Sequence, residues 1–283
     1  MPRATVALLP HGPTEEKTAV TKLPISVCII SGAESHRIGK ALASVADWTS
    51  EIVVVLNEEV SDGTEGIAVL FGAKIHRHAW QGFREQKNLV LGYAAFPWIL
   101  ALDADEEVSA ELRESILRFF DGDQERFAGA DFARKVWFMG RWITHGDWYP
   151  DRVLRLFRRD QGKWAGSPEH CAVKARGATT TLAGDLLHYS NPNISSYVGK
   201  INYFADLYLQ RQLAEKARWS AVAAVFRAAW RFGRAYFLRL GFLDGYPGFF
   251  IAASTAYSTL VRHSRLFEHL HPNNPSCAPP KSP

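Results

Sequence analysis

Cysteine is scarce in this sequence. Its three cysteines, Cys28, Cys171 and Cys277, form neither a C-x-x-C pair nor a spacing typical of metal ligands. This scarcity argues against a zinc site or a disulfide framework and favours a reducing compartment. The chain also lacks a clean apolar run of about 18 residues, which argues against a membrane-spanning helix. Its first 23 residues have no sustained apolar core, so they predict a flexible tail and not a signal peptide.

Charge of either sign is nearly balanced. The 283 residues carry a formal net charge of +4, and 47% of them are hydrophobic. A chain of this length accommodates one large α/β domain with an appendage, and its apolar content is typical of a globular core. The small cationic excess permits an anionic partner without requiring nucleic acid, and we expect no nucleic-acid partner.

Strand and helix patterns alternate in the first part of the chain. β-branched runs at 24–30, 51–56 and 73–76 predict buried strands, and segments with helical spacing of apolar residues separate them. This order predicts a doubly wound parallel sheet with right-handed crossovers.

The most informative stretch is PWILALDADEEV, residues 97–108, where an apolar run of strand length ends at Asp103 and Asp105. Open α/β sheets bind ligands at the carboxyl ends of their strands, and a period of two places both carboxylates on one side. Mg²⁺ and Mn²⁺ prefer one or two carboxylates together with phosphate oxygens, so the stretch predicts a metal–diphosphate site. The alternative is that these acidic residues favour the N-terminus of the following helix.

Other polar residues stand at the ends of predicted elements. Gln86 and Lys87 open a predicted helix, where a lysine suits a phosphate or a base edge or simply belongs to a solvated first turn. Arg155, flanked by two leucines, suits a departing diphosphate. His188 ends an apolar segment, where it either completes a metal shell or is a core histidine.

Two later segments predict a second site. The loop MGRWITHGDWYPDR, residues 139–152, interleaves aromatic rings with carboxylates as a sugar-binding cleft requires, although ordinary packing of tryptophans explains the same pattern. Glu169 and His170 follow a Gly-Ser-Pro turn. A carboxylate beside an imidazole can supply a general base, or the pair can be surface polar groups.

Residues 217–240 combine many aromatic rings with five arginines and contain no acidic residue. An arginine-rich amphipathic helix with tryptophans is typical of a segment that lies in a membrane interface, and its charge suits an anionic leaflet. The alternative is a helix packed on a core with a basic outer face.

Taken in order, these segments resemble family 2 glycosyltransferases, and within them the branch similar to bacterial lipopolysaccharide-core glucosyltransferases. The resemblance spans roughly residues 24–265, and the ordered combination is far more specific than any one motif. It rests on the apolar strand at 25–30, EIVVVL at 51–56 with DGT at 62–64, GFREQKN at 82–88, LDADEE at 102–107, WYPDRVLRLFRR at 148–159, PEH at 168–170, HYS at 188–190 and GFLDGYPG at 241–248.

The resemblance implies a GT-A fold, which is an α/β, Rossmann-like doubly wound sheet, here with a C-terminal amphipathic helical extension. We therefore expect the following division of the chain: a flexible tail at 1–23, a catalytic domain at 24–192 with a donor half at 24–120 and an acceptor half at 121–192, a helical membrane-associating extension at 193–270, and a disordered tail at 271–283.

The implied function is inverting transfer of a hexose from a nucleotide-diphosphate sugar to a saccharide or lipid-linked saccharide in bacterial cell-envelope glycan synthesis. The resemblance also implies Mg²⁺ or Mn²⁺ as cofactor, an anionic membrane surface as partner, and a cytoplasmic location at the inner face of the cytoplasmic membrane. Two alternatives are a catalytically silent nucleotide-sugar or lipid-binding protein on the same scaffold and a metal-dependent nucleotidyltransferase.

Carried over by position, the resemblance places Asp103 near the donor ribose and diphosphate and Asp105 on the metal, with Asp103 and His188 as further metal ligands. Gln86 and Lys87 border the nucleotide pocket. Ser31, at the end of the first strand, belongs to the same donor site.

This chain departs from the family pattern at two places. Many relatives carry an aspartate after the second strand for the nucleobase. Here either Asn57 or Glu58 takes its place, or the nucleobase preference has changed. Some relatives read His-Glu where this chain has Glu169 followed by His170. Glu169 is the first candidate for the base and Asp151 the second, while the metal and Arg155 stabilise the leaving group.

Overall fold

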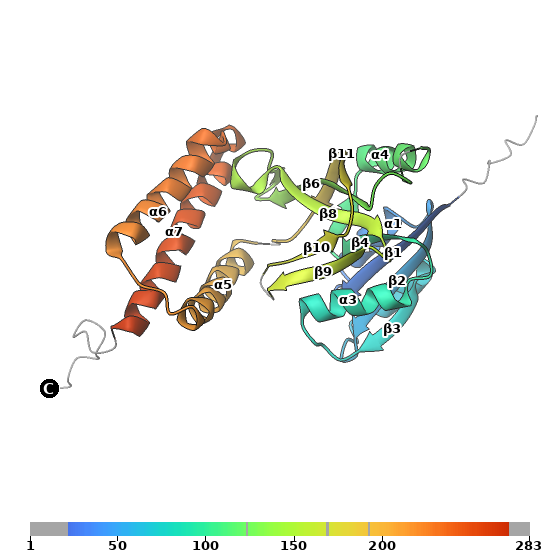
Figure 1. Cartoon of the computed structure of the whole chain (residues 1–283), viewed down its shortest axis with the longest axis horizontal. Helices are drawn as coiled ribbons and strands as arrows, with labels where there is room; N and C mark the ends of the chain where they lie inside the picture. Colours follow the sequence, from blue (N-terminus) through green and yellow to red (C-terminus); the bar gives the residue numbers. More distant parts are fainter. Residues whose placement is uncertain (1–21, 123, 168–169, 192, 272–283) are drawn as a thin grey trace, which may run out of the picture.

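The computed structural model of the protein describes residues 22–122, 124–167, 170–191 and 193–271 (Figure 1). Of the predicted tails, 1–21 and 272–283 lie outside this part, and Leu23 already belongs to the first strand. The first elements alternate as predicted: β1 (Leu23–Ser31), α1 (Ile38–Ala43), β2 (Thr49–Asn57), α2 (Thr64–Leu70), β3 (Lys74–His78), α3 (Phe83–Tyr93), β4 (Trp98–Asp103), β5 (Glu106–Val108) and α4 (Ala110–Phe120).

Antiparallel strands follow, and helices come last. The strands and one short turn are β6 (Gly129–Phe138), β7 (Arg141–Trp142), η1 (Gly146–Trp148), β8 (Asp151–Arg158), β9 (Gly162–Ser167), β10 (His170–Ala175) and β11 (Thr179–His188). The helical extension comprises α5 (Ile194–Ala214), α6 (Ala221–Gly233), the π-helical turn η2 (Arg234–Leu238), the short η3 (Gly241–Asp244) and α7 (Gly245–Leu270). The predicted helix over 217–240 is therefore shorter, because the Ser220 hydroxyl caps α6 and a π turn follows Gly233.

One large sheet positions the polar residues. Its strand order is β3-β2-β1-β4-β8-β6-β11-β5, with β7 paired to β6, while β9 and β10 form a separate hairpin. The strands β3, β2, β1 and β4 are parallel, and β8 runs antiparallel to β4. The predicted parallel half is confirmed, and the carboxyl ends of its four strands lie at one edge.

Apolar layers cover both faces of the sheet. Alternation along β1 sends Ile25, Val27 and Ile29 into a layer shared with α1 and α4, and Cys28 into a layer shared with α3 and Trp164. With both faces covered, polar side chains gather at the strand ends.

The helical extension lies beside the sheet domain (Figure 1), and two aspartates connect the two parts. The buried carboxylate of Asp244 accepts hydrogen bonds from the backbone N–H of Thr144 at 3.1 Å and of His145 at 2.8 Å. Asp147, in η1, lies 3.1–3.8 Å from the guanidinium groups of Arg231, Arg234 and Arg239. These contacts span about one hundred residues of sequence and fix the helices on the loop between β6 and β8.

Candidate functional site

Several of the predicted donor residues lie at one edge of the sheet. In the parallel register Ile30 is opposite Asp103, and Ser31 is opposite Leu56, the neighbour of Asn57. Ser31, Asn57 and Asp103 are therefore brought together at the carboxyl ends of β1, β2 and β4, where open α/β sheets bind their ligands.

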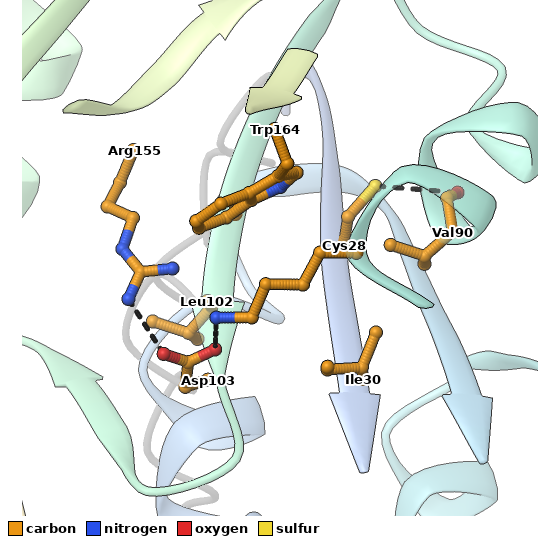
Figure 2. A pocket seen from close by; sticks show the side chains of 9 residues that line it. Cys28, Ile30, Val90, Leu102, Asp103, Arg155 and Trp164 are labelled. Carbon is orange, nitrogen blue, oxygen red and sulfur yellow. Dashed lines mark hydrogen bonds and ion pairs between the residues drawn. The ribbon is translucent and has the colours of Figure 1, made fainter. Parts of the chain in front are cut away.

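Asp103 lies between two cations (Figure 2). Lys87 Nζ, from α3, is 2.6 Å from its Oδ1, and Arg155 Nη2, from β8, is 2.7 Å from its Oδ2. Burial alone would raise the pKa of Asp103, but the charges of Arg155 and Lys87 outweigh it and hold the pKa well below its usual value. Asp103 is therefore ionised at neutral pH, with both carboxylate oxygens engaged.

Trp164, on β9, forms one wall of the cavity beside Asp103 (Figure 2). Lys87 Nζ lies 4.4 Å from the centroid of its ring, and the Arg155 guanidinium lies 5.1 Å from it. The side chain of Asn88 holds this strand in place through two hydrogen bonds of 3.0 Å to the backbone of Trp164. The ring thus orients both cations toward Asp103. Sequence reasoning missed Trp164, because only the folded hairpin brings it over α3.

Glu106 extends the network away from Asp103. Its side chain is fully buried, and its Oε1 lies 3.0 Å from Arg155 Nη2 and 3.4 Å from Arg134 Nη1. Arg134 also contacts Asp151 Oδ2 at 2.6 Å. Positive and negative groups therefore alternate from β4 through β6 to the start of β8, so that each buried charge is compensated. Arg134 was not predicted, because a single arginine in a strand that also carries Asp131 and Lys135 gives no distinct sequence signal.

Asp105 lies beside Asp103 in the turn between β4 and β5. Its Oδ1 is 3.5 Å from His188 Nε2 and its Oδ2 is 3.5 Å from Arg37 Nη1. Burial raises its pKa, but His188 and Arg37 lower it more, so the pKa of Asp105 lies below its usual value. The helix-capping alternative is wrong, since β5 intervenes and the Ser109 hydroxyl caps α4 by accepting from Leu112 N–H.

Asp105 and His188 are the residues best suited to hold a metal ion. Their mutual distance of 3.5 Å is longer than the contacts of Asp103, and His188 Nδ1 is buried without a hydrogen-bond partner. Among the described residues no three His, Cys, Asp or Glu side chains could enclose a metal by themselves. A Mg²⁺ or Mn²⁺ ion that takes one or two protein ligands and completes its shell with phosphate oxygens and water fits this arrangement.

A cleft of about 220 Å³ opens beside Asp105. Its lining includes Arg37, Lys40, Trp137 and Tyr189, and Lys40 Nζ lies 5.1 Å from the centroid of the Tyr189 ring. The Tyr189 hydroxyl donates to Glu107 Oε2 at 3.2 Å, which fixes the ring. Cations beside aromatic faces are suited to a phosphorylated sugar, because the rings pack against pyranose C–H groups while the cations contact phosphate.

The remaining predicted residues differ in their surroundings. Gln86 is buried and neither atom of its amide has a hydrogen-bond partner among the described residues, an arrangement that costs energy unless a ligand satisfies it. The side chain of Asn57 is half-buried and that of Glu58 is exposed. Glu169 lies outside the described residues, so its role as the base stays a prediction.

Residues of the loop at 139–152 contact two different parts of the molecule. Trp142 contacts Trp137 and Tyr189, with ring centroids 5.1 and 5.4 Å away, and so it supports the cleft beside Asp105. His145, Asp147 and Trp148 instead contact the helical extension. The extension therefore folds back onto the loop and engages these three residues, and their part in a sugar cleft stays a prediction.

Known proteins resemble this chain in sequence and in fold. Residues 26–180 match the family described as Glycosyl transferase family 2. An uncharacterized glycosyltransferase of Rickettsia prowazekii is 30% identical over 252 residues, or 86% of each chain. The lipopolysaccharide core biosynthesis glycosyltransferase LpsC of Rhizobium meliloti is 28% identical over 88% of this chain and 94% of its own. The mannosyltransferase PcManGT of Pyrobaculum calidifontis, solved with GDP-Man and Mn²⁺, has a TM-score of 0.52 at 13% identity over 88% of both chains.

Proposed function

Because the chain belongs to glycosyl transferase family 2, we propose that it transfers a hexose, with inversion, from a nucleotide-diphosphate sugar to a saccharide or lipid-linked saccharide of the bacterial cell envelope. The family and the GT-A fold, both predicted from the sequence, are confirmed. The relationship to a lipopolysaccharide core glycosyltransferase supports the choice of envelope glycan.

The observation that carries the proposal is the pair of carboxylates at the end of β4. Asp103 is ionised and held by Lys87 and Arg155, while Asp105 and His188 keep coordination capacity for a metal. A divalent cation bound there would neutralise the charge that develops on a departing diphosphate. Arg37 and Lys40 line the cleft beside Asp105 and would contact the same phosphates.

The nucleotide would lie over the ends of β1 and β2. Ser31, Asn57 and Glu58 follow these strands, and the unpartnered amide of Gln86 would satisfy its hydrogen bonds with the nucleoside. The pyranose would then face the aromatic side of the cleft at Trp137 and Tyr189.

Inversion requires one base to take the proton of the acceptor hydroxyl as it attacks the anomeric carbon from the side opposite the diphosphate. Glu169 remains our first candidate. Asp151, the second, already forms an ion pair with Arg134 at 2.6 Å and would have to exchange this partner to take the proton of an acceptor hydroxyl.

We also propose that the helical extension rests on the anionic inner face of the cytoplasmic membrane. Val222, Val225 and Phe226 are 62–80% exposed and recur at helical spacing on α6, and Phe237 and Leu238 in η2 are similarly exposed. No helix of the described residues has the length and apolarity needed to span a bilayer. An exposed apolar stripe beside arginines suits an interfacial position.

Transfer from radiolabelled UDP-, GDP- and ADP-sugars in the presence of Mn²⁺ tests the function. We expect sugar transfer to a lipopolysaccharide-core or lipid-linked saccharide, with inverted anomeric configuration in the product. Nucleotide-sugar binding without turnover would instead indicate a silent binding protein. Release of labelled sugar 1-phosphate when pyrophosphate is added, with formation of the nucleoside triphosphate, would indicate a nucleotidyltransferase.

A further inference from the structure

The helical extension contains a cavity that the transfer reaction does not use. It has a volume of about 220 Å³ and lies where α5, α6 and α7 meet. Arg227 and Arg231 line it from α6, and Arg262 and His263 line it from α7, with Tyr208 of α5 beside them. Residues three and four apart on a helix share one face, so α6 and α7 each present a polar stripe to the same space.

The cavity has an excess of positive charge. No carboxylate of the described chain forms an ion pair with Arg227 or Arg262, and Arg231 has only a 3.8 Å contact with Asp147, which Arg234 and Arg239 share. Arg262 Nε is buried without a hydrogen-bond partner. Burial and the charge of Arg231 lower the pKa of Arg262, and burial and Arg227 lower the pKa of His263. Gathering like charges in a partly desolvated space is unfavourable unless an anion joins them.

The cavity adjoins the exposed apolar stripe of α6. Trp230 lines the cavity and is itself 52% exposed. Viewed around the helix axis, it lies between Phe226, which belongs to the apolar stripe, and Arg227, which lines the cavity. An amphipathic ring between an apolar surface and a charged pocket is the arrangement that suits a lipid headgroup and its acyl chains.

We propose that this cavity binds the phosphate of one anionic phospholipid, with Arg227 and Arg262 as its principal donors. Guanidinium groups bind phosphate through paired, charge-assisted hydrogen bonds, so these two arginines can supply the donors that one phosphate needs. The inference rests on the proposed membrane contact of the helical extension, and adds to it a discrete headgroup site.

Calorimetric titration with dihexanoyl phosphatidate, below its micelle concentration, tests the site without vesicles. We expect one lipid per chain, affinity about tenfold weaker in Arg227→Ala, and unchanged affinity in Arg218→Ala, which removes an exposed arginine outside the cavity. If the affinity for the lipid fell equally in both variants, the effect would be general charge attraction and the proposal would be wrong. It would also be wrong if the intact protein did not bind the lipid.

Inorganic phosphate serves as the second probe. If it binds as tightly as the lipid, the cavity takes free phosphate and the lipid assignment is wrong. Flotation of the same variants with vesicles and sugar transfer to a soluble acceptor are measured in parallel. Intact flotation with no calorimetric binding would overturn the headgroup site alone, whereas absent transfer with intact lipid binding would overturn only the proposed transferase.

Discussion

The carboxyl end of the parallel sheet and the cavity in the helical extension differ in how far their charged side chains are paired with opposite charges. At the sheet end, positive and negative side chains alternate and are in contact, so the protein itself compensates each buried charge. The groups concerned are Lys87, Asp103, Arg155, Glu106, Arg134 and Asp151. In the helical cavity Arg227 and Arg262 have no carboxylate partner among the described residues, and Arg231 has only a 3.8 Å contact with Asp147. A ligand therefore joins an existing network of ion pairs at the sheet end but supplies the missing negative charge in the helical cavity. Substitution of a charged side chain should therefore lower the free energy of unfolding mainly at the sheet end.

The largest effect is expected when Arg155, the central cation of the ion-pair network at the sheet end, is replaced. Arg155→Met leaves Asp103 and the fully buried Glu106 without their shared partner, so we expect a loss of about 3–5 kcal/mol in the free energy of unfolding in urea. Arg113→Met, which breaks an exposed pair with Asp47, should cost at most about 1 kcal/mol. Similar losses in the two variants would mean that the network does not stabilise the fold.

Asp105→Asn tests the catalytic side of the same region. Loss of the charged metal ligand should reduce the rate of sugar transfer about a thousandfold, because stabilisation of the leaving diphosphate is worth several kcal/mol. Circular dichroism and the urea midpoint should remain near those of the intact protein, since the contacts that are lost, with His188 and Arg37, are both 3.5 Å long. Glu114→Gln on the exposed face of α4 is the control. Undiminished transfer by Asp105→Asn would show that the carboxylate is not needed.

Glu169→Gln addresses the base. We expect turnover to fall about a hundredfold while the donor dissociation constant stays unchanged, because a base acts on the acceptor and not on the nucleotide. Asp151→Asn is the matched variant, and its smaller expected effect reflects its engagement by Arg134. If Asp151→Asn loses more turnover than Glu169→Gln, the two assignments must be exchanged.

A third region, at the opposite end of the strands, gives the smallest effect. The Glu51 carboxylate has a lowered pKa, because hydrogen bonds from Ala95 N–H at 2.8 Å, Lys74 at 2.6 Å and Ser26 outweigh its burial. A lowered pKa means that the stabilisation is complete above the unfolded value of about 4.3 and is lost as the pH falls. The stability difference between the intact protein and Glu51→Gln should be about 1–2 kcal/mol at pH 7 and shrink below pH about 4. A difference independent of pH would contradict this account.

The parallel half of the fold was predictable because each strand carries its own local signal. A run such as EIVVVL bounded by polar residues defines a buried strand, and the acidic turn after β4 defines the ligand edge. Asp103 and Asp105 were found for the same reason.

The surroundings of these residues depend on contacts between distant segments. Arg134 reaches Asp151 through the pairing of β6 with β8, and Trp164 reaches Lys87 through the packing of the β9–β10 hairpin on α3. Asp147 was assigned to a sugar cleft because its three arginine partners come more than eighty residues later. Local periodicity carries no information about such pairings.

The central claim is that a divalent cation at Asp105 links the acidic strand end to the diphosphate of the donor. Calorimetric titration of UDP and GDP into the protein, with Mn²⁺ and then with EDTA, tests it most directly. We expect binding of at least one nucleotide that requires Mn²⁺ and is lost in Asp105→Asn. Equal affinity in EDTA, or in the variant, would contradict the claim.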